Sequence, residues 1–248
     1  MSEKLILTLD NIKPSDWEYV GGKALNLALL RRNNLKTASG LVVTTSFFES
    51  QINHFSYAPI WAGSLDVEVT EGALQFLANF LKATPLAPHL EQALKKKLAH
   101  VFPDSNTLFA VRSSAIDEDW HDRSFAGCYL TELAVPYDML TISLTRCWAS
   151  ALTGQAIEYR HKHGMSIQGI KIAVLIQPMF TPQSGGVAFT CNPVTARHNE
   201  FVIEATTGPG NHRQRIVRYQ IRLACQHCFG FDVGRQWVTA QFFQNGGI

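Results

Sequence analysis

Apolar side chains recur at helical spacing through much of the first two thirds of the chain. After Gly21-Gly22-Lys23 they stand three and four positions apart, which predicts that a glycine turn opens a helix. The same spacing predicts amphipathic helices over residues 71–82 and 88–101. Residues 137–163 are also helical in pattern, and we expect two helices there, broken near Gly154.

Short apolar runs bounded by turn residues predict strands, and most of them lie late in the chain. The expected strands are residues 41–44, 107–112, 170–180, 186–190, 201–205, 215–223 and 237–243. Ser46 is expected to cap a helix with Glu49 at the capping-box position, and Ser113 to begin a polar loop. Helices early and strands late favour an α+β chain with two lobes, approximately residues 1–115 and 116–248. No Pro- or Ser-rich linker is visible, so we expect a single domain.

Composition supports a folded chain without a strong electrostatic preference. Of the 248 residues 46% are hydrophobic and 17% are charged, which excludes a mostly disordered chain. The formal net charge of +2 gives no global field for nucleic acid or an anionic membrane, and the apolar runs are too short to span a bilayer. Five scattered cysteines and a poor signal peptide favour a reduced, cytoplasmic setting.

Two segments are candidates for binding an anion. Gly21-Gly22-Lys23 combines glycines that let backbone N–H groups approach a phosphate with the positive end of a helix and a lysine. Arg112 stands at the end of a predicted strand before two hydroxyls and can clamp a phosphate with two parallel hydrogen bonds. Each has a plainer explanation, because a glycine turn is usually only a turn and a strand-end arginine often pairs with a carboxylate.

Three further segments carry reactive or charged side chains, and for each the plainer interpretation is favoured. The acidic run at residues 117–122 has the oxygen ligands that Mg²⁺ takes, but a solvated loop is commoner. Cys225 and Cys228 have zinc or redox spacing without a convincing second ligand pair, which favours two reduced cysteines. Residues 211–222 hold four arginines and no acid, and a solvated sheet face is favoured over nucleic-acid contact.

Seven segments occur together in an order and spacing that resemble one family: the N-terminal nucleotide-binding domain of phosphoenolpyruvate synthase, pyruvate phosphate dikinase and rifampin phosphotransferase. They are VGGKALNLALL (20–30), SGLVVTTSFF (39–48), FAVRSSAIDEDWHDRSFAGCYLTEL (109–133), LTRCWASALTGQAIEYRHKHG (144–164), IAVLIQPMF (172–180), SGGVAFTCNPVT (184–195) and FVIEATTGPG (201–210). The resemblance runs from about residue 15 to about residue 210 and implies an ATP-grasp-like fold, in which two lobes clamp ATP.

The resemblance also implies a role for particular residues at the phosphates. Lys23 would contact the ATP phosphates, and Arg112 would reach them where charge develops during phosphoryl transfer. Gly127 would let a loop backbone close over the phosphates, and Thr131 would donate its hydroxyl nearby. The acidic residues 117–122 would belong to the segment that covers the nucleotide.

At the adenine the resemblance implies a hinge formed by Gln177, Pro178 and Met179. Gln177 and backbone groups would read the edge of the base. Met179 would supply a soft apolar wall.

In the family, ATP phosphorylates a histidine on a separate domain, and the phosphoryl group passes to pyruvate or to an antibiotic hydroxyl. Mg²⁺ is expected with ATP, yet Asn211 stands where the family has Gly-Glu, and no acidic pair for the metal is found in residues 225–248. We therefore expect the chain to cover most of one ATP-grasp-like domain and to stop before its last catalytic segment. Separate chains would then supply the phosphohistidine and acceptor domains. The alternative is a degenerate, non-catalytic module that binds a nucleotide or a protein partner.

Overall fold

The computed structural model describes residues 4–55, 70–116, 129–166, 170–180, 182–192, 194–198, 200–207 and 217–222. The chain divides into two compact units, Met1–Met179 and Phe180–Ile248, and each is described by itself. Gly127, the acidic residues 117–122, the expected strand at 237–243 and the cysteines at 225 and 228 lie outside the described residues.

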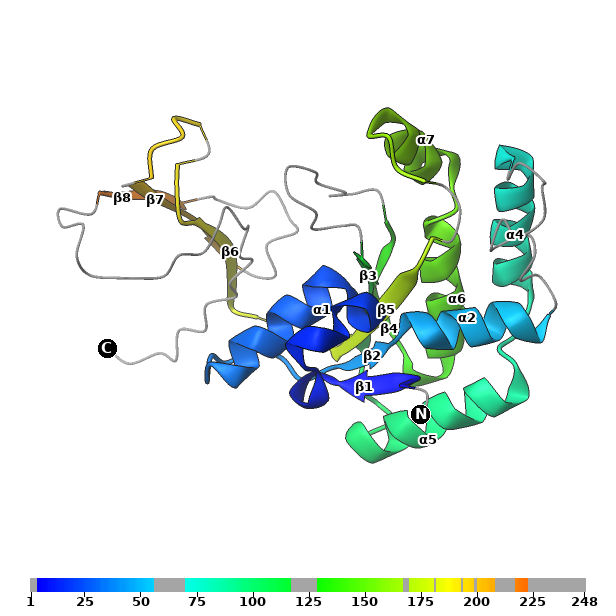
Figure 1. Cartoon of the computed structure of the whole chain (residues 1–248). Coiled ribbons are helices and arrows are strands. Elements are labelled where there is room, and N and C mark those ends of the chain that lie inside the picture. The colour runs from blue at the N-terminus through cyan, green and yellow to red at the C-terminus, as the bar shows by residue number, and fades with distance from the viewer. Residues whose placement is uncertain are drawn as a thin grey trace. The chain divides into compact units, whose positions relative to one another are not determined.

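The first unit is built on an antiparallel sheet of five strands (Figure 1). The strands are β1 (Ile6–Thr8), β2 (Leu41–Val43), β3 (Phe109–Ala115), β4 (Thr131–Val135) and β5 (Ile172–Pro178). Their order across the sheet is β1-β2-β5-β3-β4, so β5, the last along the chain, lies in the centre. It pairs with β3 over all seven residues, from Phe109 opposite Pro178 to Ala115 opposite Ile172.

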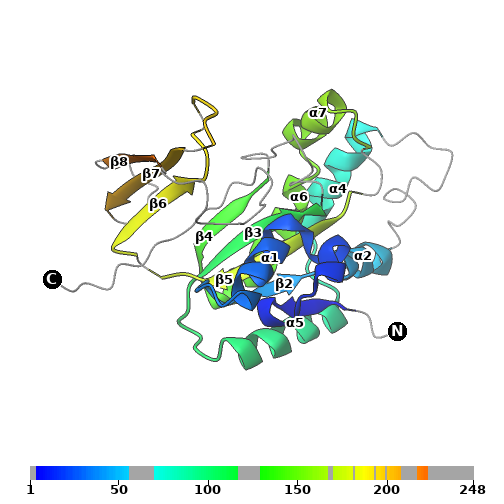
Figure 2. The same cartoon turned by 60° about the vertical axis from the view of Figure 1, so that its left-hand side comes forward.

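Helices cover both faces of this sheet (Figure 2). They are α1 (Trp17–Arg32), α2 (Thr45–His54), α4 (Glu71–Ala83), α5 (Pro88–Val101), α6 (Leu140–Ser150) and α7 (Gly154–Lys162), with short 3₁₀ helices η1 (Leu9–Asn11), η2 (Pro14–Asp16) and η4 (Tyr137–Met139). Helix α1 packs on one face, and α2 and α6 pack on the other. The leucines at positions 90, 94 and 98 explain α5, because that spacing forms one buried stripe.

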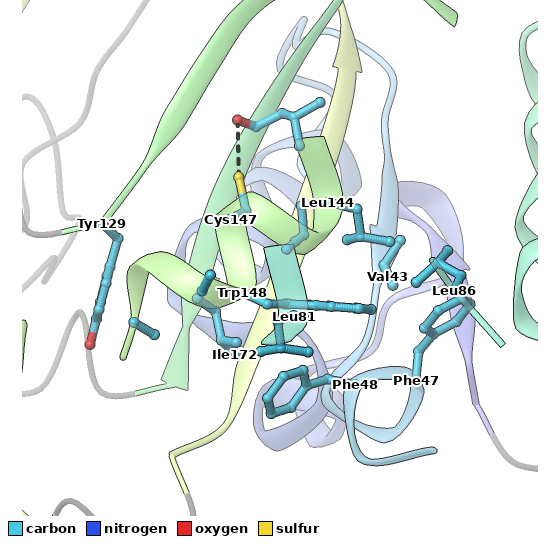
Figure 3. Close-up of a cluster of buried hydrophobic side chains, with 14 of the residues drawn as sticks. Val43, Phe47, Phe48, Leu81, Leu86, Tyr129, Leu144, Cys147, Trp148 and Ile172 are labelled. Atoms are coloured by element: carbon cyan, nitrogen blue, oxygen red, sulfur yellow. Dashed lines mark hydrogen bonds between the residues drawn. The ribbon is translucent and has the colours of Figure 1, made fainter. Parts of the chain in front are cut away.

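Two hydrophobic cores result, one on each face. On the side of α6, Trp148 is fully buried against Phe47 and Phe48, with ring centroids 6.0 and 5.3 Å away (Figure 3). On the opposite side, Ala173 and Leu175 of β5 pack with residues of α1. Since neighbouring strand residues point to opposite faces, β5 is buried on both sides and reads as a continuous apolar run.

Most helix predictions are confirmed, and so are the strands at 41–44, 107–112 and 170–180, to within a few residues. Two predictions are wrong. β3 continues through Ser113 and Ser114, which are both fully buried, so the polar loop does not begin there. Helix α2 is capped by Thr44, whose hydroxyl accepts a hydrogen bond from the Phe47 amide at 3.4 Å, and not by Ser46. The glycine turn does open a helical segment, because α1 consists of two segments joined at the non-helical Gly21, the first of which begins at Trp17.

The second unit contains an antiparallel sheet in the order β6-β7-β8. Its strands are β6 (Ser184–Phe189), β7 (Glu200–Thr207) and β8 (Val217–Arg222), which confirms the strands expected at 186–190, 201–205 and 215–223. Between β6 and β7, the buried carboxylate of Glu200 accepts hydrogen bonds from Asn192 at 2.8 Å and Arg197 at 3.0 Å. The chain is therefore of the α+β class. None of its described helices is long and apolar enough to cross a membrane.

Candidate functional site

Helix α1 is kinked at Gly21, next to the sheet. Gly21 has φ 71° and ψ 171°, so two helical segments join there at a left-handed residue. A Cβ at this position would lie 2.1 Å from the carbonyl oxygen of Ser114 on β3. Both the backbone conformation and the close approach therefore require glycine.

The side chain of Ser114 closes the kink. Its hydroxyl donates a hydrogen bond to the Val20 carbonyl at 2.7 Å and accepts one from the Ala24 amide at 3.1 Å. The start of the second helical segment is thereby fixed to the end of β3, about 90 residues away in sequence.

Lys23 reaches the strand beside Arg112 at this junction. The Lys23 ammonium donates to the Ser113 carbonyl at 3.3 Å, which places it next to the residue that follows Arg112. The Arg112 Nε atom is buried, and no described residue accepts a hydrogen bond from it. The plainer explanation for a strand-end arginine, a paired carboxylate, is not found among the described residues. A buried donor without an acceptor is costly, and an anion would satisfy it.

The sheet register brings Thr131 to the same place. Thr131 of β4 stands directly opposite Arg112 of β3, so the two side chains share the face that α1 covers elsewhere. Helix α1 packs on β2, β3 and β5, while Thr131 and Leu133 on β4 are exposed. The face beside Arg112 therefore offers a hydroxyl and an apolar side chain to a ligand.

Gln177 lies further along this face, where it stands opposite Ala110 on β3. Its side chain is buried, and its Nε2 atom is 3.5 Å from the carbonyl oxygens of both Ala38 and Ser39. These are long hydrogen bonds to the loop before β2. The amide is thus oriented by backbone groups and can exchange them for a ligand at little cost.

Met179 closes the end of the face. Its amide donates to the Leu108 carbonyl at 2.7 Å, and its sulfur accepts from the Ala134 amide at 2.8 Å. Ala134 has φ 55°, and the register between β3 and β4 shifts at this point. The bulge leaves Leu108, Leu133 and Met179 partly exposed as apolar side chains at one end of the sheet.

The opposite face of β3 and β4 is closed by hydrophobic packing and polar contacts with α6. There Glu132 accepts hydrogen bonds from Ser143 and Arg146. The Cys147 thiol lies 3.7 Å from the Val111 carbonyl (Figure 3). Burial raises the pKa of this thiol to about 12. A thiol of that pKa is not a nucleophile at neutral pH.

Metal ligands are not gathered in the described part of the chain, where no three His, Cys, Asp or Glu side chains form a group able to hold a metal ion. The residues described here thus do not by themselves make a site for the Mg²⁺ that the resemblance implies.

Ser114 is the residue of this site that the sequence analysis missed. The segment FAVRSSA mixes small and apolar side chains, and a strand that continued through Ser114 would show the same pattern. Nothing in it indicates a contact with a helix about 90 residues earlier.

Comparison with known proteins identifies the family of this chain. Residues 17–218 match the model of the pyruvate phosphate dikinase AMP/ATP-binding domain. The chain belongs to this family. The dikinase-type resemblance of its seven segments is thereby confirmed, and the match covers both α1 with Lys23 and β3 with Arg112.

The chain is also similar in sequence to curated dikinase-type enzymes. The chain is 30% identical to phosphoenolpyruvate synthase of Aeropyrum pernix over 223 residues, which cover 86% of this chain and 27% of the relative. It is 33% identical to a rifampicin phosphotransferase of a Streptomyces species over 221 residues, covering 85% and 25% of the two proteins. The chain thus spans about a quarter of the length of these relatives.

Proposed function

We propose that this member of the dikinase AMP/ATP-binding family binds ATP on the α1 face of its first sheet. The observation that carries the proposal is the buried Arg112 Nε atom, which has no acceptor among the described residues. Arg112 stands opposite Thr131, and the Lys23 ammonium contacts the carbonyl of the residue after Arg112. Two cations at one strand end fit a polyphosphate better than a neutral ligand.

Different site residues bind the phosphates and the base of the nucleotide. Lys23 and Arg112 hold the phosphates, Thr131 donates its hydroxyl to them, and Gly127 closes a loop backbone over them. Gln177 reads the base edge, and the exposed thioether of Met179 packs against the base. In this arrangement the chain is one ATP-grasp-like domain.

The reaction proposed for the whole assembly is phosphoryl transfer of the phosphoenolpyruvate synthase or rifampicin phosphotransferase kind. ATP and water yield AMP, phosphate and a phosphohistidine on another domain or chain, and that phosphoryl group then moves to pyruvate or a similar acceptor. Arg112 and Lys23 stabilise the negative charge that spreads over the transferred group and hold ATP in line with the histidine. Mg²⁺ bound to the triphosphate would neutralise part of its charge, with any protein ligands drawn from outside the described residues.

Calorimetric titration with Mg-ATP tests the proposal. Wild-type protein should bind ATP saturably, and Lys23→Met should weaken binding by about 10- to 100-fold, the range for a lost charge-assisted contact. Lys95→Met is the matched control, because Lys95 lies exposed on α5 and pairs with Glu91 on its own helix. Wild-type protein without saturable binding, or equal binding by the Lys23 variant, would contradict the proposal. Equal losses from both lysine variants would place the site elsewhere.

A further inference from the structure

One hydrogen bond of α1 is replaced by a side chain from the sheet. In an uninterrupted helix the amide of residue 24 donates to the carbonyl of residue 20. Here the Ser114 hydroxyl stands between Ala24 and Val20, accepting from the amide at 3.1 Å and donating to the carbonyl at 2.7 Å. A side chain inserted into the helical ladder is one of the recognised causes of a sharp kink.

The inserted hydroxyl is enclosed. Ser114 is fully buried, and so are Val20 and Ala24. Without the hydroxyl, a buried N–H and a buried C=O would lose their partners at a place where the solvent-exposed fractions of all three residues are zero. The two backbone groups can regain a partner only by moving toward each other, which straightens the kink and shifts the helix start.

Lys23 lies inside the segment that would shift. It immediately precedes Ala24, whose amide Ser114 holds, and its ammonium reaches the Ser113 carbonyl at 3.3 Å. Three consecutive residues of β3 thus contribute to the same part of the site. Arg112 supplies a guanidinium, Ser113 a carbonyl contact for Lys23, and Ser114 the hydroxyl that fixes the helix.

We infer that Ser114 is a positioning residue for nucleotide binding: through the kink at Gly21, its hydroxyl sets Lys23 beside Arg112 at the phosphates. The inference rests on the proposed function. Ser114 does not itself touch the nucleotide, and it acts only through the placement of Lys23. Misplacement of a charged group by about 1 Å can cost one to two orders of magnitude in a positioned site.

A double-mutant cycle tests the inference with the full chain and Mg-ATP as the probe. Ser114→Ala should weaken ATP binding by about tenfold in the wild-type background. In the Lys23→Met background the same change should alter affinity by less than about twofold, since the residue that it positions is gone. A merely structural role would instead give the same loss in both backgrounds.

Ser143→Ala is the matched control. Ser143 is a buried serine of α6 whose hydroxyl donates to Glu132 on the opposite face of the sheet, so this variant also loses a serine hydroxyl contact but not at the phosphates. Its ATP affinity should stay within about twofold of wild type. If Ser114→Ala does not fold, as judged by circular dichroism and thermal melting, Ser114→Cys keeps a weak donor and acceptor at this position and should show the same pattern with a smaller loss.

The outcomes separate the two ideas. ATP binding that Lys23→Met weakens and Ser114→Ala leaves unchanged overturns the positioning role and leaves the proposed function standing. Equal losses from Ser114→Ala in both backgrounds also overturn it. Wild-type protein that shows no saturable ATP binding removes the proposed function, and the positioning role with it.

Discussion

A Cβ on Gly21 would lie 2.1 Å from the carbonyl oxygen of Ser114, closer than any non-bonded carbon and oxygen can come. Backbone stands on both sides of this contact, so no side chain can rotate away to relieve it. The contact fixes the distance between α1 and β3 at the point where Lys23 contacts the Ser113 carbonyl.

Gly21→Ala is therefore expected to lower the free energy of unfolding by at least about 2 kcal/mol, from the positive φ and the backbone clash together. Chemical denaturation monitored by far-UV circular dichroism measures the change. Gly154→Ala is the control, because the Cβ that it would add at the start of α7 has open space around it, with no described atom beyond its chain neighbours and its own helix backbone within 4 Å. A Gly21→Ala protein as stable as the Gly154→Ala protein would disprove the steric argument.

Arg112→Met should separate stability from binding. Its buried Nε atom has no acceptor in the described structure, so removing it should raise the free energy of unfolding by about 1 kcal/mol. ATP affinity should fall at least tenfold, which calorimetry measures. Arg32→Met at the exposed end of α1 should change neither quantity. A loss of both stability and affinity at Arg112 would mean that the arginine has a structural partner instead.

Thr44 and Ser46 give a direct test of the helix cap. The Thr44 hydroxyl accepts from the Phe47 amide and lies 2.7 Å from the Lys4 carbonyl, so it ties α2 to β1 as well. Thr44→Ala should reduce the free energy of unfolding by about 1–2 kcal/mol. Ser46→Ala should be nearly neutral, and a larger effect at Ser46 than at Thr44 would restore Ser46 as the cap.

Asp16 makes part of the stability depend on pH. Burial opposes ionisation of its carboxyl group, but the hydrogen bond from Lys4 at 2.6 Å and the amide of Lys13 at 2.8 Å outweigh burial, and the net pKa lies below the ordinary value of 3.8. The folded state therefore favours the carboxylate. The resulting stability is fully present above the unfolded pKa and is lost as the pH falls through the lower folded pKa.

Asp16→Asn measures this contribution. Its deficit in unfolding free energy relative to wild type should be constant near neutral pH and should shrink below about pH 4. Urea denaturation at a series of pH values follows the difference, with Asp138→Asn on exposed η4 as a control for the lost charge. A deficit that stays constant down to about pH 2 would show that the carboxylate has no preferred charge state in the fold.

Cys147 should resist alkylation in the folded protein. Burial raises its pKa to about 12, so roughly one thiol in ten thousand is ionised at pH 8, and the side chain is also inaccessible. Iodoacetamide treatment followed by peptide mass spectrometry should find Cys147 modified only after denaturation. Cys191, which is partly exposed, should react in the native state. Native modification of Cys147 would mean that the core around α6 opens readily.

Local patterns were sufficient for the helices and for most strands. The leucine stripe of α5 and the break before α7 at Gly154 can be read from spacing alone, because one buried face or one glycine decides each. β4 was missed, since its exposed residues Thr131 and Leu133 flank the half-buried Glu132 and give no inside–outside alternation. The short β1 was missed for a similar reason, because three residues carry too little pattern.

The candidate site was predicted from residue types and motif order, and its roles stay predictions. Arg112 stands opposite Thr131, Lys23 contacts the Ser113 carbonyl, Gln177 stands opposite Ala110, and Gly127 lies outside the described residues. What the sequence could not show is the contact between α1 and β3. A hydrogen bond between the Ser114 hydroxyl and the Val20 carbonyl spans 94 positions and leaves no trace in either segment.

The place of β5 in the sheet has a consequence for synthesis of the chain. This strand separates β2 from β3, yet it is completed only at Pro178, after every other strand of its sheet has been made. A nascent chain that has reached α7 holds two pairs of strands, β1 with β2 and β3 with β4, whose inner edges have no hydrogen-bonding partner. During synthesis on the ribosome, the sheet of the first unit therefore cannot be completed until residues 172–178 have emerged. Until then the edges of β2 and β3 stay unpaired, so we expect chaperone binding to the nascent chain to depend on this one segment.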